Sequence, residues 1–75
     1  MSGKLSLEGL IFQATKIDVS NNILTIILNR PEKKNALNNV MMKEINYALA
    51  YAKQERSVRV VIIAAEGDVF CAGAD

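Results

Sequence analysis

The sequence predicts an α/β fold in which a β-hairpin is followed by a helix and a strand parallel to the hairpin. Three observations support this prediction. Two runs with strand character flank a short polar turn, apolar residues recur at helical spacing over residues 39–56, and a nearly all-apolar run follows at residues 58–65. The order strand, helix, strand is typical of a βαβ unit, whose two strands are parallel. Residues 1–75 are all expected to belong to a single domain.

The hairpin is predicted from its two strands and its turn. The first strand is predicted over Leu10–Val19, where apolar and polar residues partly alternate, and the second over Ile23–Leu28, which is rich in β-branched residues. Ser20–Asn22 has the composition of a turn, because asparagine tolerates the left-handed backbone. The next segment, Asn29–Lys34, is predicted to be a loop, because Pro31 lacks a backbone N–H and disfavours helical backbone in the residue before it.

The helix is predicted over about Asn39–Arg56, with Asn38 or Asn39 as its N-cap. Apolar residues at positions i, i+4, i+7, i+8 and i+11 form one face of this helix. They are Met41, Ile45, Ala48, Leu49 and Ala52. The polar residues of the helix, Glu44 among them, are expected to lie mostly away from that face.

The last predicted strand, Val58–Ala65, is almost entirely apolar. Such a run is typical of a strand that is covered on both faces, as in a parallel sheet. One helix cannot cover both faces of a sheet, so the sequence predicts an α/β fold that is incomplete by itself. We expect the remainder of a larger fold or a partner chain to cover this strand, because its open edge would otherwise favour aggregation. We therefore expect poor solubility or self-association.

Composition and charge exclude several classes of function. Nine Lys and Arg against eight Asp and Glu give a net charge of +1, which is no reason to propose nucleic acid or an anionic membrane as partner. The sequence has no histidine, so it offers no histidine-based triad. Cys71 therefore has no imidazole to activate it as a nucleophile, and we interpret it as a small packing residue. No metal site is expected. The chain shows neither a secretory signal nor a bilayer-spanning stretch, and we expect a cytoplasmic protein.

The segment Phe70–Asp75 is the most informative part of the sequence for function. It is built largely from Ala and Gly and follows a buried strand, so a ligand can approach its main chain closely. A purely structural interpretation is also open, in which the segment is only a tight turn and Lys33–Lys34 is a solvated pair. Glu66 and Asp68 precede the segment at a polar turn, and we expect them to be solvated rather than to serve as acid–base groups.

Two motifs resemble those of one enzyme family. Asn29-Arg30-Pro31 followed by Asn35-Ala36-Leu37 is similar to the N-R-P…N-A-L signature of the enoyl-CoA hydratase/isomerase (crotonase) superfamily, and Phe70–Asp75 is similar to its F-x-A-G-A-D segment. One helix and one apolar strand separate the motifs, as in the family. The whole chain resembles the N-terminal portion of a crotonase-like domain, which is a spiral of repeated ββα units.

The resemblance implies a site that binds acyl-CoA thioesters and stabilises an enolate-type oxyanion with two backbone N–H groups. It implies that Ala74 supplies one of these N–H groups. It also implies a set of residues that contact the substrate or its CoA part: Lys34, Ala36, Leu37, Ala72, Gly73 and Asp75. In the family the second oxyanion donor and the acid–base glutamates come later in the chain than position 75. Coenzyme A enters as part of the substrate, and no separate cofactor is expected.

Two functions therefore remain open at the level of the sequence. The chain is the N-terminal portion of an acyl-CoA hydratase/isomerase, in which case the resemblance implies a homo-oligomer, a trimer or hexamer. Alternatively, it is a truncated, non-catalytic module that acts through association with another subunit. In neither case are the 75 residues expected to be active alone.

Overall fold

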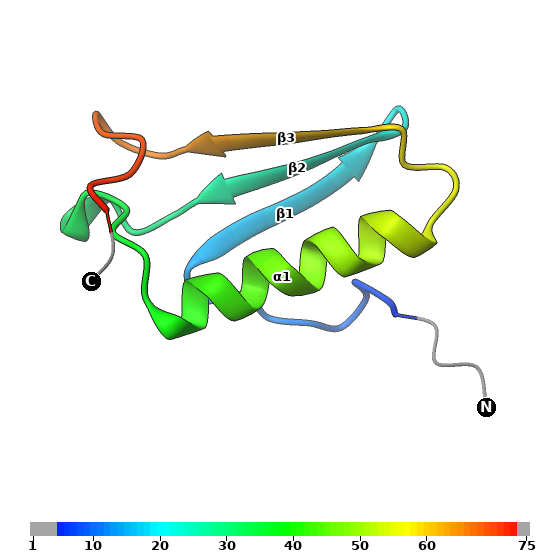
Figure 1. Ribbon diagram of the computed structural model, residues 1–75, viewed down its shortest axis with the longest axis horizontal. Helices are drawn as coiled ribbons and strands as arrows, with labels where there is room; N and C mark the ends of the chain where they lie inside the picture. Colours follow the sequence, from blue (N-terminus) through cyan, green and yellow to red (C-terminus); the bar gives the residue numbers. More distant parts are fainter. Residues whose placement is uncertain (1–4, 74–75) are drawn as a thin grey trace.

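The computed structural model describes residues 5–73 and contains a three-stranded sheet with one long helix packed beneath it (Figure 1). The elements follow one another along the chain as β1 (Thr15–Ser20), β2 (Ile23–Leu28), the 3₁₀ helix η1 (Pro31–Lys33), α1 (Asn39–Gln54) and β3 (Val60–Ala65). The strand order is β1-β2-β3, with β1 antiparallel and β3 parallel to the central strand β2. The predicted α/β arrangement of hairpin, helix and parallel strand is confirmed.

The hairpin turn consists of Asn21 and Asn22, which both have left-handed backbone (φ 52° and 68°). Two consecutive left-handed residues match the right-handed twist of the flanking strands, so asparagine suits this turn. The Asn22 side-chain amide donates a hydrogen bond to the Ser57 carbonyl oxygen (2.7 Å), and the Asn22 carbonyl oxygen accepts one from the Arg59 N–H (2.8 Å). The turn is thereby joined to the segment that leads into β3.

The start of the first strand differs from the prediction. The strand begins at Thr15 rather than Leu10, and the side chain of Ile11 is 90% exposed. Thr15 pairs with Leu28, the last residue of β2, so the residues before Thr15 have no strand beside them. The apolar residues of the segment 10–14 therefore do not make it a strand, because a strand needs a hydrogen-bonding partner.

Glu44 supplies hydrogen-bond acceptors for the backbone groups that precede β1. Its carboxylate accepts hydrogen bonds from the N–H groups of Gln13 (2.6 Å) and Ala14 (2.9 Å) and from the Thr15 hydroxyl (2.8 Å). A charged acceptor strengthens such bonds. Glu44 thus joins the helix to the start of the sheet, a contact that its helical spacing alone did not predict.

The core lies between β2 and α1. Leu24, Ile26 and Leu28 alternate along β2, are almost completely buried, and face the helix side. The helix contributes Met41 and Ala48 to the same core. Leu49, which the helical spacing places on the apolar face, is instead 41% exposed because it lies at the margin of that face.

The ends of α1 are set by local chemistry. Asn38 is the N-cap, as predicted, and its side-chain oxygen accepts a hydrogen bond from the Met41 N–H (2.8 Å). The helix ends at Gln54, two residues before the predicted end, where Glu55 takes up extended backbone. Among residues 5–73, no helix has both the length and the apolar character needed to cross a membrane.

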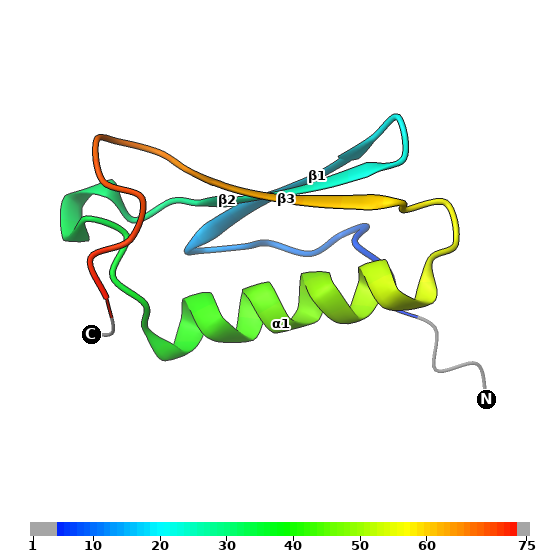
Figure 2. The same cartoon turned by 45° about the horizontal axis from the view of Figure 1, so that its top comes forward.

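The edge strand β3 is less covered than its composition predicted. The side chains of Val60–Ile63 are between 39% and 50% exposed. The reason is geometric, since α1 packs against β1 and β2, and the other face of the sheet carries no helix in the described part of the chain (Figure 2). The described residues therefore form a sheet with two open edges, β1 and β3, and one bare face, which agrees with the expectation of an incomplete fold.

Candidate functional site

Two loops meet at the end of the sheet where β2 and β3 finish. β2 and β3 are parallel and in register from Ile23–Val60 to Leu28–Ala65, so their carboxyl ends lie at the same edge. In open α/β sheets this edge is where ligands bind. The two loops are residues 29–37 after β2 and residues 66–73 after β3, and they carry the two motifs found in the sequence (Figure 1).

The loop after β2 is a compact turn held by its own backbone. Pro31 opens η1, where its missing N–H is not needed. Lys34 and Asn35 then have left-handed backbone (φ 53° and 57°), and the Lys34 N–H donates to the Pro31 carbonyl oxygen (3.0 Å). The Arg30 guanidinium donates to the Ala36 carbonyl oxygen across the turn. Contacts within the loop thus define its shape.

Asn35 joins this loop to the loop after β3. Its side chain is fully buried, and its amide group donates to the carbonyl oxygens of Glu66 (2.7 Å) and Val69 (2.8 Å). Its side-chain oxygen accepts a hydrogen bond from the Arg30 N–H (2.7 Å). A buried amide with partners for both hydrogens and for its oxygen is a strong local constraint, because any lost partner leaves a buried polar group unsatisfied.

Two backbone hydrogen bonds bring the motifs side by side. The Leu37 N–H donates to the Gly73 carbonyl oxygen (2.8 Å), and the Ala72 N–H donates to the Lys34 carbonyl oxygen (3.0 Å). Ala72 and Gly73 are exposed, and a Cβ built on Gly73 would have no atom within 4 Å. The main chain at Ala72 and Gly73 is therefore both fixed in place and open to a ligand.

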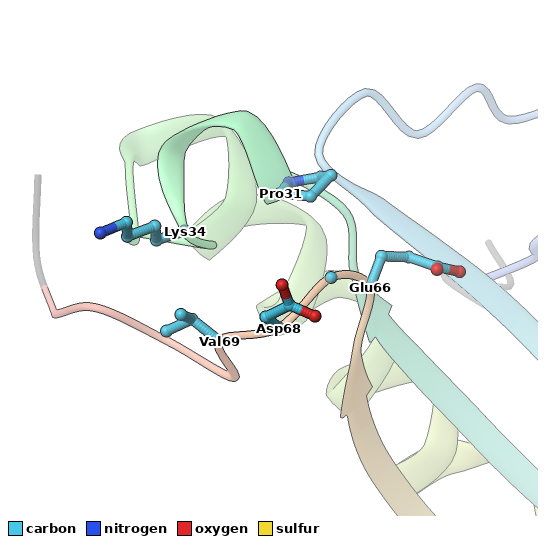
Figure 3. A pocket seen from close by; sticks show the side chains of 6 residues that line it. Pro31, Lys34, Glu66, Asp68 and Val69 are labelled. Atoms are coloured by element: carbon cyan, nitrogen blue, oxygen red, sulfur yellow. The ribbon is translucent and has the colours of Figure 1, made fainter.

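A shallow pocket of about 270 Å³ lies beside these loops (Figure 3). It is lined by Pro31, Lys34, Glu66, Gly67, Asp68 and Val69. Lys34 extends away from the Glu66 and Asp68 carboxylates, and Glu66 forms an ion pair with Lys16 (3.1 Å). Two carboxylates in its lining make this pocket unfavourable for a phosphate, so the junction of the two backbones is the better candidate for a ligand site.

Gly67 allows the two loops to approach each other beside this pocket. It has left-handed backbone (φ +86°), and a Cβ at this position would lie only 3.0 Å from the Pro31 Cβ. A larger residue would be both strained and crowded. The close contact between the loops after β2 and β3 therefore depends on this glycine.

The structure brings together most of the residues predicted for the site. Lys34 is exposed and Ala36 is half-buried. Leu37 uses its side chain to pack against the core cluster that contains Met41, so only its backbone faces the second loop. Ala74 and Asp75, the predicted oxyanion donor and its neighbour, lie outside the described residues.

The sequence analysis did not identify the role of Asn35, but it interpreted Cys71 correctly as a packing residue. Asn35 was part of a motif, but it was not among the predicted site residues. A usable signal was the asparagine directly after a turn, because asparagine is the residue that combines a left-handed backbone with a side-chain amide. Cys71 packs against the core and its thiol lies 3.8 Å from the Gly73 carbonyl oxygen, which agrees with its interpretation as a small packing residue.

Comparison with known proteins identifies the family. The sequence pattern of the enoyl-CoA hydratase/isomerase family matches residues 18–75. The chain is 44% identical to a mouse protein named enoyl-CoA hydratase domain-containing protein 2, mitochondrial, over 75% of this chain and 19% of the mouse protein. It is 38% identical to the trans-2-decenoyl-[acyl-carrier-protein] isomerase of Streptococcus mutans, over 85% of this chain and 24% of the isomerase.

The fold gives the same result as the sequence. The structure is similar to the crystal structure of an enoyl-CoA hydratase/isomerase from Mycobacterium paratuberculosis, with a TM-score of 0.84 and 35% identity over 87% of this chain and 26% of that one. The chain spans about a fifth to a quarter of the length of the curated relatives it matches. Both the sequence pattern and the fold lead to one conclusion: the chain belongs to the enoyl-CoA hydratase/isomerase family.

Proposed function

We propose that residues 29–37 and 66–75 form part of an acyl-thioester site of the hydratase/isomerase type, in which backbone groups hold the reacting carbonyl. The observation that supports this most directly is the pair of backbone hydrogen bonds between the loops, from Leu37 to Gly73 and from Ala72 to Lys34. These bonds fix a stretch of main chain that is open to solvent at the carboxyl edge of a parallel sheet. That is the arrangement a backbone-based site requires.

The chemistry of the proposed site is oxyanion stabilisation. The carbonyl oxygen of a thioester gains negative charge when a proton leaves the adjacent carbon or when water adds to a conjugated double bond. A preorganised N–H at hydrogen-bond distance stabilises that charge, and loss of one such donor raises the barrier by about 3 kcal/mol. We propose the Ala74 N–H as this donor, because Ala74 directly follows Gly73, whose carbonyl oxygen is held by Leu37. No residue of this chain is assigned to the acid–base step.

The coenzyme A part of the substrate is proposed to contact both loops. Lys34 is exposed and is suited to pair with a phosphate as a mobile point charge. The Ala72 N–H already donates to the Lys34 carbonyl oxygen, so Ala72 would contact the adenine through its remaining backbone atoms and its small side chain. Ala36 and Gly73 are small enough to let a ligand reach the main chain, and Asp75 is proposed to flank the oxyanion donor.

The proposal extends to the assembly around the site. We propose that residues 1–75 are the N-terminal portion of one crotonase-like domain, that coenzyme A enters only as part of the substrate, and that the protein forms a homo-oligomer, a trimer or hexamer. By their names, the mouse relative contains an enoyl-CoA hydratase domain, and the Streptococcus mutans relative is an isomerase of trans-2-decenoyl-[acyl-carrier-protein]. The cytoplasmic location stays a prediction, since the mouse relative is mitochondrial by name.

The proposal is tested by titrating the ¹⁵N-labelled chain with butyryl-CoA and following its amide resonances. We expect the largest shifts at Lys34, Ala36, Ala72 and Gly73, and no shift at the Asn21–Asn22 turn at the opposite end of the sheet. Free butyrate, which lacks coenzyme A, is the control that tests whether the coenzyme A part is needed for binding. Shifts confined to the hairpin, or no shifts at saturating ligand, would refute a thioester site at these loops.

The alternative function is a non-catalytic module that associates with another subunit. The observation that favours it is the row of exposed apolar side chains on the edge strand, Val60–Ile63. Light scattering on the purified chain, combined with the butyryl-CoA titration, separates the two functions. A stable assembly that does not bind butyryl-CoA would favour the module, whereas ligand binding at the two loops favours the enzyme-derived site.

A further inference from the structure

We propose that Asn35 is a positioning residue, whose side chain sets the location of the ligand-facing backbone at Ala72 and Gly73. This inference rests on the proposed function for its consequence in ligand binding, but its structural part stands on contacts within the chain. Asn35 is 0% exposed, and hydrogen bonds join its side chain to three separate backbone positions, at Arg30, Glu66 and Val69.

The turn that contains Asn35 contacts both halves of the loop after β3. The Asn35 side-chain amide holds the first half through the carbonyl oxygens of Glu66 and Val69. The backbone on either side of Asn35 holds the second half, because the Lys34 carbonyl oxygen accepts from Ala72 and the Leu37 N–H donates to Gly73. The side chain and the flanking backbone of one turn therefore fix the whole of residues 66–73.

Other polar contacts between the loop after β3 and the rest of the described chain lie at its first residue, where the Glu66 N–H donates to the Leu28 carbonyl oxygen (2.9 Å) and the Glu66 side chain pairs with Lys16. Gly67 and Gly73 have no side chains, and the Phe70 side chain is 56% exposed. Cys71 is the loop residue that packs against the described core cluster of Ala14, Leu28 and Met41. Apolar packing is thus small, and hydrogen bonds from the preceding turn must define where the loop backbone lies. A site made of backbone groups needs this kind of support, because a displaced donor stabilises no charge.

The backbone conformation at Asn35 explains why asparagine suits this position. Its φ of 57° is left-handed, which costs most residues energy but is tolerated by asparagine and glycine. Glycine would keep the turn but would remove the amide group. The exchange Asn35→Gly therefore removes the side-chain contacts while leaving the backbone conformation accessible, and it isolates the positioning effect.

The chain offers a matched control at the opposite end of the sheet. Asn22 also has left-handed backbone (φ 68°), and its side-chain amide also donates to a backbone carbonyl, that of Ser57 at 2.7 Å. Asn22→Gly thus removes a chemically similar contact far from the two loops. The two variants differ in which segment the asparagine holds.

The test combines amide hydrogen exchange with butyryl-CoA titration on the purified protein. For Asn35→Gly we expect exchange at the Leu37 and Ala72 amides to accelerate about tenfold or more relative to the β2–β3 ladder, and the Kd for butyryl-CoA to rise about tenfold. For Asn22→Gly we expect both quantities to stay within about twofold of the parent. Unchanged exchange at Leu37 and Ala72, or acceleration equal to that of the ladder, would overturn the positioning role.

The two proposals can fail separately. If exchange accelerates locally but the parent protein does not bind butyryl-CoA, the positioning role is supported and the proposed function is rejected. If Asn35→Gly does not fold, the parent protein is used instead, with exchange followed at increasing urea concentrations. If the Leu37 and Ala72 amides begin to exchange at the same urea concentration as the Asn35 side-chain amide, the proposal is supported. If they begin to exchange at different urea concentrations, the proposal is overturned.

Discussion

The turns at the two ends of β2 have the same backbone conformation but different surroundings. At one end Asn21 and Asn22 have φ values of 52° and 68°, and at the other Lys34 and Asn35 have values of 53° and 57°. In both turns a side-chain amide donates to a backbone carbonyl. The hairpin asparagine is exposed, whereas Asn35 is fully buried and holds a distant loop.

The difference shows how one local conformation can serve two purposes. Both turns hold residues more than thirty positions away. Asn22 makes one such side-chain contact, to Ser57, from an exposed position. The buried Asn35 side chain makes two, to Glu66 and Val69, at the end of the sheet where the candidate site lies. Changes at the second end should therefore have larger effects than similar changes at the hairpin.

The largest effect is expected from Asn35→Asp. The aspartate keeps the oxygen that accepts from the Arg30 N–H, but it places a second oxygen opposite the carbonyl oxygens of Glu66 and Val69. Loss of two buried hydrogen bonds, with repulsion in their place, should lower the free energy of unfolding by about 3 kcal/mol. Urea denaturation followed by circular dichroism measures this change.

The hairpin supplies the comparison for that variant. Asn22→Asp loses a hydrogen bond to the Ser57 carbonyl oxygen at an exposed position, and it should cost about 1 kcal/mol or less. Equal losses for the two variants would mean that the buried and exposed asparagines are equivalent, and the distinction drawn between the two ends of β2 would be wrong.

The second effect concerns Glu44, which holds the start of β1 near the same end of the sheet. Glu44→Ala removes the acceptor of the Gln13 N–H, the Ala14 N–H and the Thr15 hydroxyl, and it should cost about 2 kcal/mol. Glu44→Gln keeps one side-chain oxygen and should lose about half as much. Thermal unfolding of both variants measures the difference, and a larger loss for Gln than for Ala would contradict the assigned contacts.

An effect of similar size is expected from Gly67→Ala. The new Cβ would meet the Pro31 Cβ at 3.0 Å, and the backbone φ of +86° disfavours any side chain, so the two effects together should cost about 2 kcal/mol. Gly9→Ala is the matched control, because Gly9 has a similar φ of +75° with no atom within 4 Å. It should cost about 1 kcal/mol. The difference in urea midpoint between Gly67→Ala and Gly9→Ala reports the contact between the loops after β2 and β3. Equal midpoints for the two variants would contradict that contact.

Much of the fold was predictable because its signals are local. The asparagine pair predicted the hairpin turn, and the spacing of apolar residues predicted α1 with Asn38 as its N-cap. The prediction was wrong where a long-range partner decides the outcome. Leu10 has strand character but lacks a neighbouring strand. The contact of Glu44 with the backbone before β1 was not predicted, because helical spacing places a residue on a face and does not identify its partner.

The candidate site was predictable only in part, for the same physical reason. The small residues Ala72 and Gly73 indicated an accessible main chain, and the structure describes both as exposed. The sequence could not show that Asn35 would be buried against the second loop, because that contact depends on the parallel register of β2 and β3. Local patterns predict a turn, and only tertiary contacts assign it a role.

The smallest effect is expected from the ion pair between Lys16 and Glu66, whose charged groups lie 3.1 Å apart. Their side chains are 56% and 44% exposed, so solvent weakens the attraction and the coupling should be about 0.5 kcal/mol or less. The Glu66 backbone, by contrast, accepts a hydrogen bond from the buried Asn35 amide. A double-mutant cycle of Lys16→Gln and Glu66→Gln, measured at low and high salt, determines the coupling. A coupling well above 1 kcal/mol would mean that the exposed side chains, rather than Asn35, determine where Glu66 lies.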